Sequence, residues 1–471
     1  MGYITKNFSK QHLEVVMTNP ISSSKNLDPS NPYDSENLKS IVDDLLKEAH
    51  SQGASAAEAG LSVESGLSVT VRMGEVETIE HNRDKGLGVT VYFGNRKGSA
   101  STSDFSLKAV KETVKAACDI ARYTEDDPYA GLPDKNLMAT DIPDLDLYHP
   151  WDISAEEAVE LAKECEDVAR AEDKRIINSE GGSVSSHSGI RVYGNTQGFL
   201  NGYNTSRHSM SCTMIAEQDA AMQRDYWYSV NRDASKLESA SDIGKHAAQR
   251  TVNRLGAKSM PTCQVPVIFK AEVAKGLLSH FLAGIRGGAQ YRKASFLLDH
   301  LGKQIFPERI RLDERPHLKS ALGSAPYDNE GVITKAHDLI TDGVLQSYVL
   351  DSYAARRLEM QSTGNSGGVH NLYINHDDIA LDAMIKEMGK GLLITEVMGQ
   401  GVNTVTGDYS RGASGFWIEN GEIQYPVEEF TLASRLQDMF MGLQQVGNDL
   451  DTRGGVITGS WLIDNMTVAG G

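Results

Sequence analysis

Several short patterns in the sequence resemble motifs that bind phosphate, but each lacks a residue that the chemistry needs. The glycines at 454–459 have the spacing of a phosphate-binding loop, yet Ser460 and Trp461 stand where the Lys and Ser/Thr pair must be. Gly399-Gln-Gly401 continues as Val-Asn-Thr, so the third glycine of a dinucleotide fold is missing. The sequence therefore does not favour nucleotide binding.

Candidate nucleophiles and metal ligands are equally weak. Gly364-Asn-Ser-Gly-Gly368 spells a nucleophile elbow, but helix-like residues 353–360 precede it and strand-like residues 371–374 follow it, the reverse of an elbow. A glycine turn is the preferred interpretation. No two of the 13 histidines are spaced i, i+4, and His370 and His376 are interpreted as loop and strand residues rather than ligands. No Asp/Glu pair stands out as a general acid and base, so no catalytic residue is assigned.

A helix expected over residues 272–285 places two polar residues, Ser279 and His280, beside an apolar stripe. Its apolar residues form one unbroken stripe: Ala274, Leu277, Leu278, Phe281, Leu282 and Ile285. At about 100° per residue, Ser279 and His280 fall off the centre of that stripe and should face away from the core. From periodicity alone, His280 is interpreted as a solvated helix histidine.

The elements around this helix alternate between helical and strand periods. Residues 38–49 predict an amphipathic helix, and residues 59–63, 67–71 and 88–93 predict short antiparallel strands separated by glycine turns. Ser154 with Glu157 forms a capping box for a further helix. Asn420-Gly421 predicts a tight hairpin, and residues 460–468 predict a final strand. Helices and strands that do not alternate as βα units indicate an α+β fold with antiparallel sheets.

Length and charge limit the function further. The 471 residues predict more than one domain, and we expect a polar arm over 1–35, an N-terminal α+β domain over 36–245 and a C-terminal domain over 246–471. The net charge of −18 argues against nucleic acid or an anionic membrane as the main partner. The start has no apolar core for a signal peptide, no apolar run would span a bilayer, and the four cysteines form no CxxC pair. A cytoplasmic location is expected.

One long run carries a specific resemblance. Residues 395–431, with a glycine loop, Asp408-Tyr409 and the hairpin in fixed order, resemble the C-terminal region of the TldD/PmbA family (modulator of DNA gyrase family), on its PmbA/TldE side. Residues 98–102, 127–133 and 463–468 support the likeness, which extends from about residue 36 to the end. The resemblance implies an N-terminal domain of antiparallel sheet with flanking helices and a mostly β, barrel-like C-terminal domain with a few helices.

The family includes a zinc peptidase subunit, TldD, whose helix carries HExxxH. Aligning that helix through Leu277-Leu278 places Ser279 at the first histidine, His280 at the glutamate and Gly284 at the second histidine. Rebuilding the motif there would use the outward flank of the helix. The expected thiolate ligand is also missing, since residues 447–471 contain no cysteine. The resemblance therefore implies a chain without its own zinc or other cofactor, inactive alone.

Because the chain lacks the zinc-binding residues of TldD, the resemblance implies that it works with a partner. The chain would pair as a heterodimer with a zinc-bearing TldD-type paralogue to form a metalloprotease that cleaves unstructured peptides, with microcin maturation and antitoxin turnover as family roles. Glycine-rich strands would line a shared peptide cavity, with these candidate residues: Gly399, Gly401, Asn403, Thr406, Gly407, Asp408 and Arg411. The alternative is a homodimeric, gyrase-modulator-type regulator that binds a peptide or protein without hydrolysis.

Overall fold

The computed structural model describes residues 35–470. The expected polar arm lies outside the described residues except for Ser35, where the first helix, α1 (Ser35–Ser51), begins. That helix buries Leu38, Val42 and Leu45, which are members of the predicted apolar stripe. The amphipathic helix expected near residues 38–49 is therefore confirmed.

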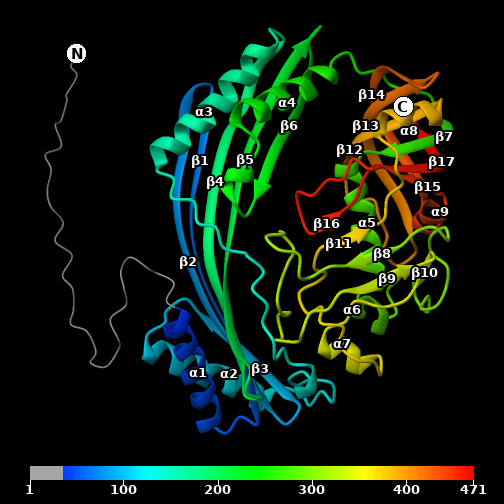
Figure 1. The fold of residues 1–471 in the computed structure, drawn as a ribbon. Helices are drawn as coiled ribbons and strands as arrows, with labels where there is room; N and C mark the ends of the chain where they lie inside the picture. Colours follow the sequence, from blue (N-terminus) through cyan, green and yellow to red (C-terminus); the bar gives the residue numbers. More distant parts are fainter. Residues whose placement is uncertain (1–34, 471) are drawn as a thin grey trace, which may run out of the picture. The chain divides into compact units, whose positions relative to one another are not determined.

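The N-terminal half forms one long antiparallel sheet of six strands in the order β3-β2-β1-β4-β5-β6 (Figure 1). Its strands are β1 (Ala56–Arg72), β2 (Glu75–Phe93), β3 (Arg96–Thr102), β4 (Ile176–Asn195), β5 (Leu200–Gln218) and β6 (Ala221–Asn231). Neighbouring strands run antiparallel throughout, as the period-two pattern predicted.

The strands are longer than the sequence indicated. Residues 59–63 and 67–71 belong to one continuous strand, so the expected turn at Gly66 is wrong. Gly66 pairs with His187 on β4, and a Cβ at this position would lie 2.3 Å from the His187 Nδ1 atom. The glycine therefore admits a side chain of the neighbouring strand instead of turning the chain.

Helices cover one face of this sheet. In chain order they are α2 (Leu107–Tyr123), α3 (Ala155–Glu172) and α4 (Ala240–Asn253), and Figure 1 shows α3 and α4 along the long strands. The predicted capping box opens α3: the Glu157 N–H donates to Ser154 Oγ (3.1 Å), and the Ser154 N–H donates to Glu157 Oε2 (2.9 Å). The domain boundary expected at residues 245–246 falls inside α4, which packs on α3 and β6.

The C-terminal half contains a closed ring of five strands. The strands are β7 (Cys263–Phe269), β12 (Gly391–Met398), β13 (Asp408–Glu419), β14 (Glu422–Arg435) and β17 (Trp461–Ala469), and β15 (Leu443–Val446) adds to β17. The ring closes because Thr431 of β14 pairs with Ala469 of β17. Asn420 and Gly421 both have positive φ, 55° and 73°, which confirms the predicted tight hairpin.

A small second sheet and several helices complete this half. The sheet has the order β10-β9-β8-β11-β16, formed by β8 (Leu312–Glu314), β9 (His337–Thr341), β10 (Val344–Leu345), β11 (Leu372–Ile374) and β16 (Val456–Ile457). The helices are α5 (Ala271–Ile285), α6 (Gly287–Tyr291), α7 (Ser352–Arg357), α8 (Leu381–Met388) and α9 (Leu436–Met441). The expected α+β class with a barrel-like C-terminal region is confirmed.

The largest apolar core lies in the C-terminal half. Phe281 of α5 packs edge-on against Phe306 and Phe440, and Trp461 of β17 joins the same aromatic group. All four side chains are fully buried. Within residues 35–470, no helix combines the length and apolarity that a membrane crossing requires.

Candidate functional site

Helix α5 is positioned by residues distant in sequence. Its N-cap residue, Lys270, makes no side-chain cap; instead the Ala271 N–H donates to Ser460 Oγ (3.0 Å). Ser460 in turn donates to Asp449 Oδ2 (2.6 Å). The serine that breaks the phosphate-loop pattern thus caps α5 by satisfying one of its free N–H groups. All six predicted stripe residues are buried.

The three positions aligned with a zinc-binding motif differ in their surroundings. Ser279 is exposed, as predicted, and its hydroxyl donates to the Lys275 carbonyl (3.0 Å). His280 is only partly exposed, because its ring packs edge-on against Tyr409 with centroids 6.2 Å apart. Burial, with a smaller contribution from Arg411, lowers the pKa of His280, so the ring is neutral near pH 7.

Gly284 does not lie on the outward flank, and that expectation is wrong. The residue is buried, and a Cβ there would lie 2.8 Å from Phe296 Cε1 and 3.1 Å from Leu297 Cδ1. Its carbonyl accepts hydrogen bonds from Gln290 Nε2 and Ser295 Oγ, both 2.6 Å long. A histidine side chain has no space here without displacing this turn.

These positions therefore do not fit a zinc ion. A catalytic zinc site needs about three protein ligands, whereas position 279 presents a hydroxyl bonded to its own helix and position 284 presents no side chain. Across the described part of the chain, no three His, Cys, Asp or Glu side chains gather as a metal-binding group.

The glycine loop at 399–411 is held by contacts within itself. Asn403 Oδ1 accepts from the Val405 N–H (2.9 Å), and the Thr406 hydroxyl donates to Asp408 Oδ2 (2.5 Å). Gly401 lies against the backbone of the facing strand, since a Cβ would be 1.7 Å from the Ser410 carbonyl oxygen. Gly399 and Gly407 have φ of 81° and 88°, and Arg411 donates to the Val397 and Met398 carbonyls, both at 3.4 Å.

A network of charged residues surrounds the first turns of α5, and the sequence did not predict it. Glu272 lies 2.6 Å from Arg250 Nη1 and 3.3 Å from Arg453 Nη2. Asp451 accepts from Lys275 Nζ (2.8 Å) and Arg453 Nε (3.0 Å). Because its members come from α4, α5 and the segment before β16, no local spacing could have revealed the network.

The network lowers the pKa of Asp451 well below its ordinary value. Burial opposes its ionisation, but hydrogen bonds from Arg453 and Lys275 outweigh that cost and hold its pKa at about 2. The Arg453 guanidinium also lies over the rings of Trp227 (4.1 Å) and Tyr228 (4.5 Å) of β6. The network therefore ties the long sheet to α5.

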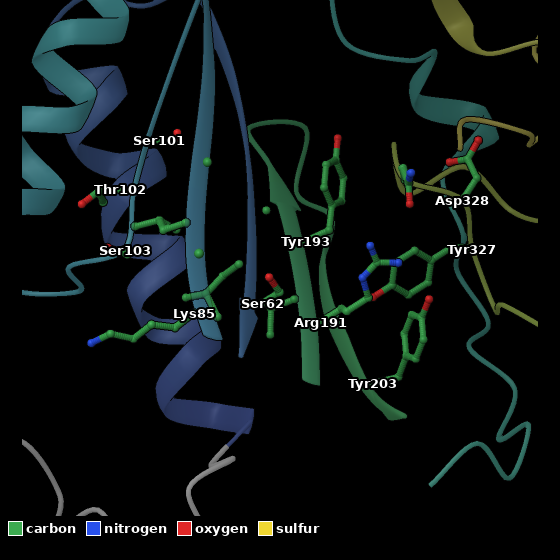
Figure 2. A pocket seen from close by; sticks show the side chains of 17 residues that line it. Ser62, Lys85, Ser101, Thr102, Ser103, Arg191, Tyr193, Tyr203, Tyr327 and Asp328 are labelled. Atoms are coloured by element: carbon green, nitrogen blue, oxygen red, sulfur yellow. The ribbon is translucent and has the colours of Figure 1, made fainter. Parts of the chain in front are cut away.

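Two hollows lie between the long sheet and loops of the C-terminal half. One, of about 840 Å³, is lined by strands β1 to β5 and by residues 327–329. The other, of about 570 Å³, is lined by β1, β4 and β5, by Arg232, and by the loop residues 322–325, 327, 329 and 366–370. Both include Ser62, Arg191, Tyr203, Tyr327 and Asn329, so they meet at these residues. Figure 2 shows the side chains at the larger hollow.

Among the described residues, the loops contribute one carboxylate, Asp328, which lines the larger of the two hollows. Its oxygens accept three backbone N–H groups, from Glu330, Val332 and Ser366, each at 2.9 Å. Burial nevertheless raises its pKa to about 6, against the effect of those hydrogen bonds. Ser366, the serine of the apparent nucleophile elbow, lies in a turn between α7 and β11, which agrees with the glycine-turn interpretation.

Comparisons with known proteins identify the class of this structure. Family models match along most of the chain: PmbA/TldA metallopeptidase domain 1 at residues 57–121, the central domain at 148–255 and the C-terminal domain at 262–470. The metalloprotease PmbA of Escherichia coli O157:H7 is 51% identical over 414 residues, 88% of this chain and 92% of that protein. The chain therefore belongs to the PmbA/TldD family of metallopeptidases.

Solved structures agree with this assignment. A putative modulator of DNA gyrase from Bacteroides thetaiotaomicron has a TM-score of 0.88 at 28% identity, covering 93% of this chain and 99% of that one. TldE from Thermococcus kodakarensis has a TM-score of 0.76 at 20% identity, covering 91% and 100%, which shows a shared fold. The resemblance seen in residues 395–431 is thereby confirmed.

Proposed function

We propose that this chain is the zinc-less subunit of a two-chain PmbA/TldD-type metalloprotease that cleaves unstructured peptides. In this proposal a TldD-type paralogue holds the zinc and supplies the activated water, and this chain completes the enzyme. The observation that carries the proposal is Gly284, which is sealed behind Phe296 and Leu297 where the peptidase motif needs its second histidine.

The loop at 399–411 supports a role in contacting a partner or a peptide. Met398 and Val405 at this loop are exposed at 46% and 51%, although both are apolar. The loop is also anchored to the core, since the Thr404 carbonyl accepts from the Phe296 N–H (2.9 Å). Exposed apolar side chains on an anchored loop suit contact with a peptide or with a partner chain. We therefore retain the loop as a proposed lining of the shared cavity.

The test is co-expression of this chain with a paralogue that carries HExxxH. We expect a heterodimer on size exclusion with light scattering, with zinc bound only when the paralogue keeps both histidines. The pair should digest an unfolded peptide, and neither chain alone should match it. This chain purified alone should hold no stoichiometric zinc after dialysis.

Two results would contradict the proposal. One is a paralogue that is fully active alone and elutes separately from this chain at micromolar concentration, which would favour the homodimeric binding regulator. The other is stoichiometric zinc in this chain, which would show that the alignment through Leu277 and Leu278 is wrong.

A further inference from the structure

The face of the long sheet that lines the two hollows carries two arginines without acidic partners. Arg191 on β4 lies opposite Tyr203 on β5, and Arg207 on β5 lies opposite His187 on β4. Both arginines are exposed, and neither forms an ion pair with another residue in the range 35–470. We call the joined hollows, lined by Ser62, Lys85, Arg191, Tyr203, Arg207 and Tyr327, the arginine groove.

The charge of the arginine groove is opposite to that of the whole chain. Arg191, Arg207 and the buried Arg232 line it in a protein whose net charge is −18. Lys85 borders the larger hollow, but its ammonium group lies over the Phe105 ring (5.2 Å) and points away from Arg191 (Figure 2). Two carboxylates also line it: Glu64 faces His187 Nδ1 at 3.3 Å, and Asp328 accepts three backbone N–H groups. Three arginines against two carboxylates leave the groove with a net positive charge, which favours an anionic ligand.

A third arginine, Arg232, lies buried in the lining of the groove. Arg232 is 7% exposed and donates to the carbonyls of Ala321 (3.0 Å), Leu322 (3.0 Å) and Ser206 (3.2 Å). Because these acceptors are neutral carbonyls, they do not cancel the positive charge of Arg232. The same contacts hold the loop at 321–322 against the sheet, so the groove is pre-formed.

The hydroxyl of Tyr327 is an unused hydrogen-bond donor among the residues shared by the two hollows. Tyr327 is 5% exposed, and its hydroxyl has no hydrogen-bond partner among the described residues. Its ring packs edge-on against Tyr203 (5.4 Å), and Figure 2 shows it reaching from the loop toward Arg191 on the sheet. A buried hydroxyl without a partner is costly, and an acceptor placed beside Arg191 would relieve that cost.

We propose that the arginine groove binds an extended peptide through acidic side chains, with one carboxylate on Arg191 and Tyr327 and a second on Arg207. Arg207 lies level with His187, four residues along β4 from Arg191. That separation is about 13 Å, which equals the spacing of residues i and i+4 on one face of an extended chain. The choice of a peptide as ligand rests on the proposed function; the preference for negative charge rests on the groove alone.

The experiment measures binding to the isolated chain, without a paralogue and without hydrolysis. The probe is a fluorescein-labelled, twelve-residue Gly/Ser peptide with glutamates at i and i+4, and binding is followed by anisotropy. Matched peptides carry glutamine or lysine at the same positions, and a fourth carries glutamates at i and i+3, on opposite faces. A single-stranded DNA twelve-mer is the competitor.

The expected result is a preference for the i, i+4 glutamate peptide that falls with added salt. R191Q and R207Q should each weaken binding about tenfold, the loss typical of one charge-assisted hydrogen bond. Y327F should weaken it several-fold while R191 and the fold are retained. The control is R170Q, an exposed arginine at the end of α3 on the helix-covered face, which should bind like the parent.

Three results would overturn the inference: equal binding of the glutamate and lysine peptides, an R170Q loss as large as that of R191Q, or displacement by the DNA at lower concentration than by unlabelled peptide. The last would show that the groove reads phosphate. Because pairing is not involved, a failed co-expression leaves this test standing. Conversely, a working heterodimer with no acidic preference would refute the groove and not the proposed function.

Discussion

Gly284 is the residue that prevents helix α5 from carrying the second histidine of the peptidase motif. A helix of fifteen residues contains two interior glycines, Gly276 and Gly284, and their surroundings are opposite. A Cβ at Gly276 would meet no heavy atom within 4 Å, whereas one at Gly284 would press on Phe296 and Leu297. The first glycine is free to change, and the second is required by close packing.

This contrast gives a prediction within one helix. Gly284→Ala should destabilise the protein by about 1–3 kcal/mol, because overpacking forces Phe296 to move. Gly276→Ala should stabilise it by about 0.4–1 kcal/mol through lower entropy of the unfolded chain and better helix propensity. Urea unfolding of both variants decides the matter, and a Gly284→Ala variant as stable as the parent would contradict the packing.

The same residue limits any attempt to restore the peptidase motif. Writing HExxxH into this helix by S279H, H280E and G284H puts an imidazole where not even a methyl group fits. Periodicity predicts that Ser279 is exposed, because the position of a residue around a helix follows from its spacing along the chain. Gly284 lies seven residues after Leu277 and three after Phe281, so helical spacing already places it beside the apolar stripe rather than on the outward flank. The sequence could not show that Phe296 and Leu297, from the loop after α6, fill the space next to it.

At the scale of elements, the β13–β14 hairpin shows what local sequence determines. Asn420 and Gly421 take the positive φ values that a type I′ turn needs, and the turn also lies close to α8. A Cβ on Gly421 would lie 3.0 Å from Lys386 Cα and 3.1 Å from its carbonyl oxygen. Both the backbone conformation and the neighbouring helix therefore require glycine.

We expect Gly421→Val to lower the free energy of unfolding by at least about 1–2 kcal/mol, the cost of a side chain at left-handed φ. Glu419→Gln is the matched change two residues away. It removes an exposed ion pair with Lys390 (3.5 Å) and should stay within about 0.5 kcal/mol of the parent. Equal shifts in the thermal midpoint of the two variants would show that position 421 does not need the positive φ of a type I′ turn.

Other elements could not have been predicted from local sequence. The capping box of α3 is readable because Ser154 and Glu157 are neighbours, but the cap of α5 comes from Ser460, 189 residues away in sequence. Barrel closure likewise depends on the pairing of Thr431 with Ala469. The sequence pattern predicts two short strands where β1 is one, because the role of Gly66 is ambiguous until its partner His187 on β4 is known. Non-local contacts account for each of these gaps.

At the scale of the whole molecule, the network around Asp451 joins parts that the sequence keeps far apart. Arg250 of α4 links Asp225 of β6 (3.3 Å) to Glu272 of α5 (2.6 Å), and Arg453 continues from Glu272 to Asp451. These side chains are mostly buried, so their attraction is weakly screened. The long sheet and α5 should therefore unfold together rather than separately.

Removing one carboxylate from this network tests that coupling. Asp451→Asn leaves Lys275 without its partner and should cost about 2–3 kcal/mol at pH 7, since the loss of one member of a buried pair is expensive. Asp43→Asn, which removes an exposed pair with Lys47 on α1, should change stability by less than about 0.5 kcal/mol. A single unfolding transition by fluorescence and circular dichroism is expected for both variants.

The pH dependence of that cost gives the sharper test. The pKa of Asp451 is about 2 in the folded chain against an ordinary 3.8, so the folded state holds its proton less tightly than the unfolded state does. Its contribution is therefore fully present above about pH 4 and is lost as the pH falls through the folded pKa near 2. The stability difference between the parent and Asp451→Asn should stay constant from pH 8 to pH 5 and shrink steadily below pH 4. A difference that grows on acidification, or one that is as small as that of Asp43→Asn at pH 7, would show that Asp451 is not the ionised centre of the network.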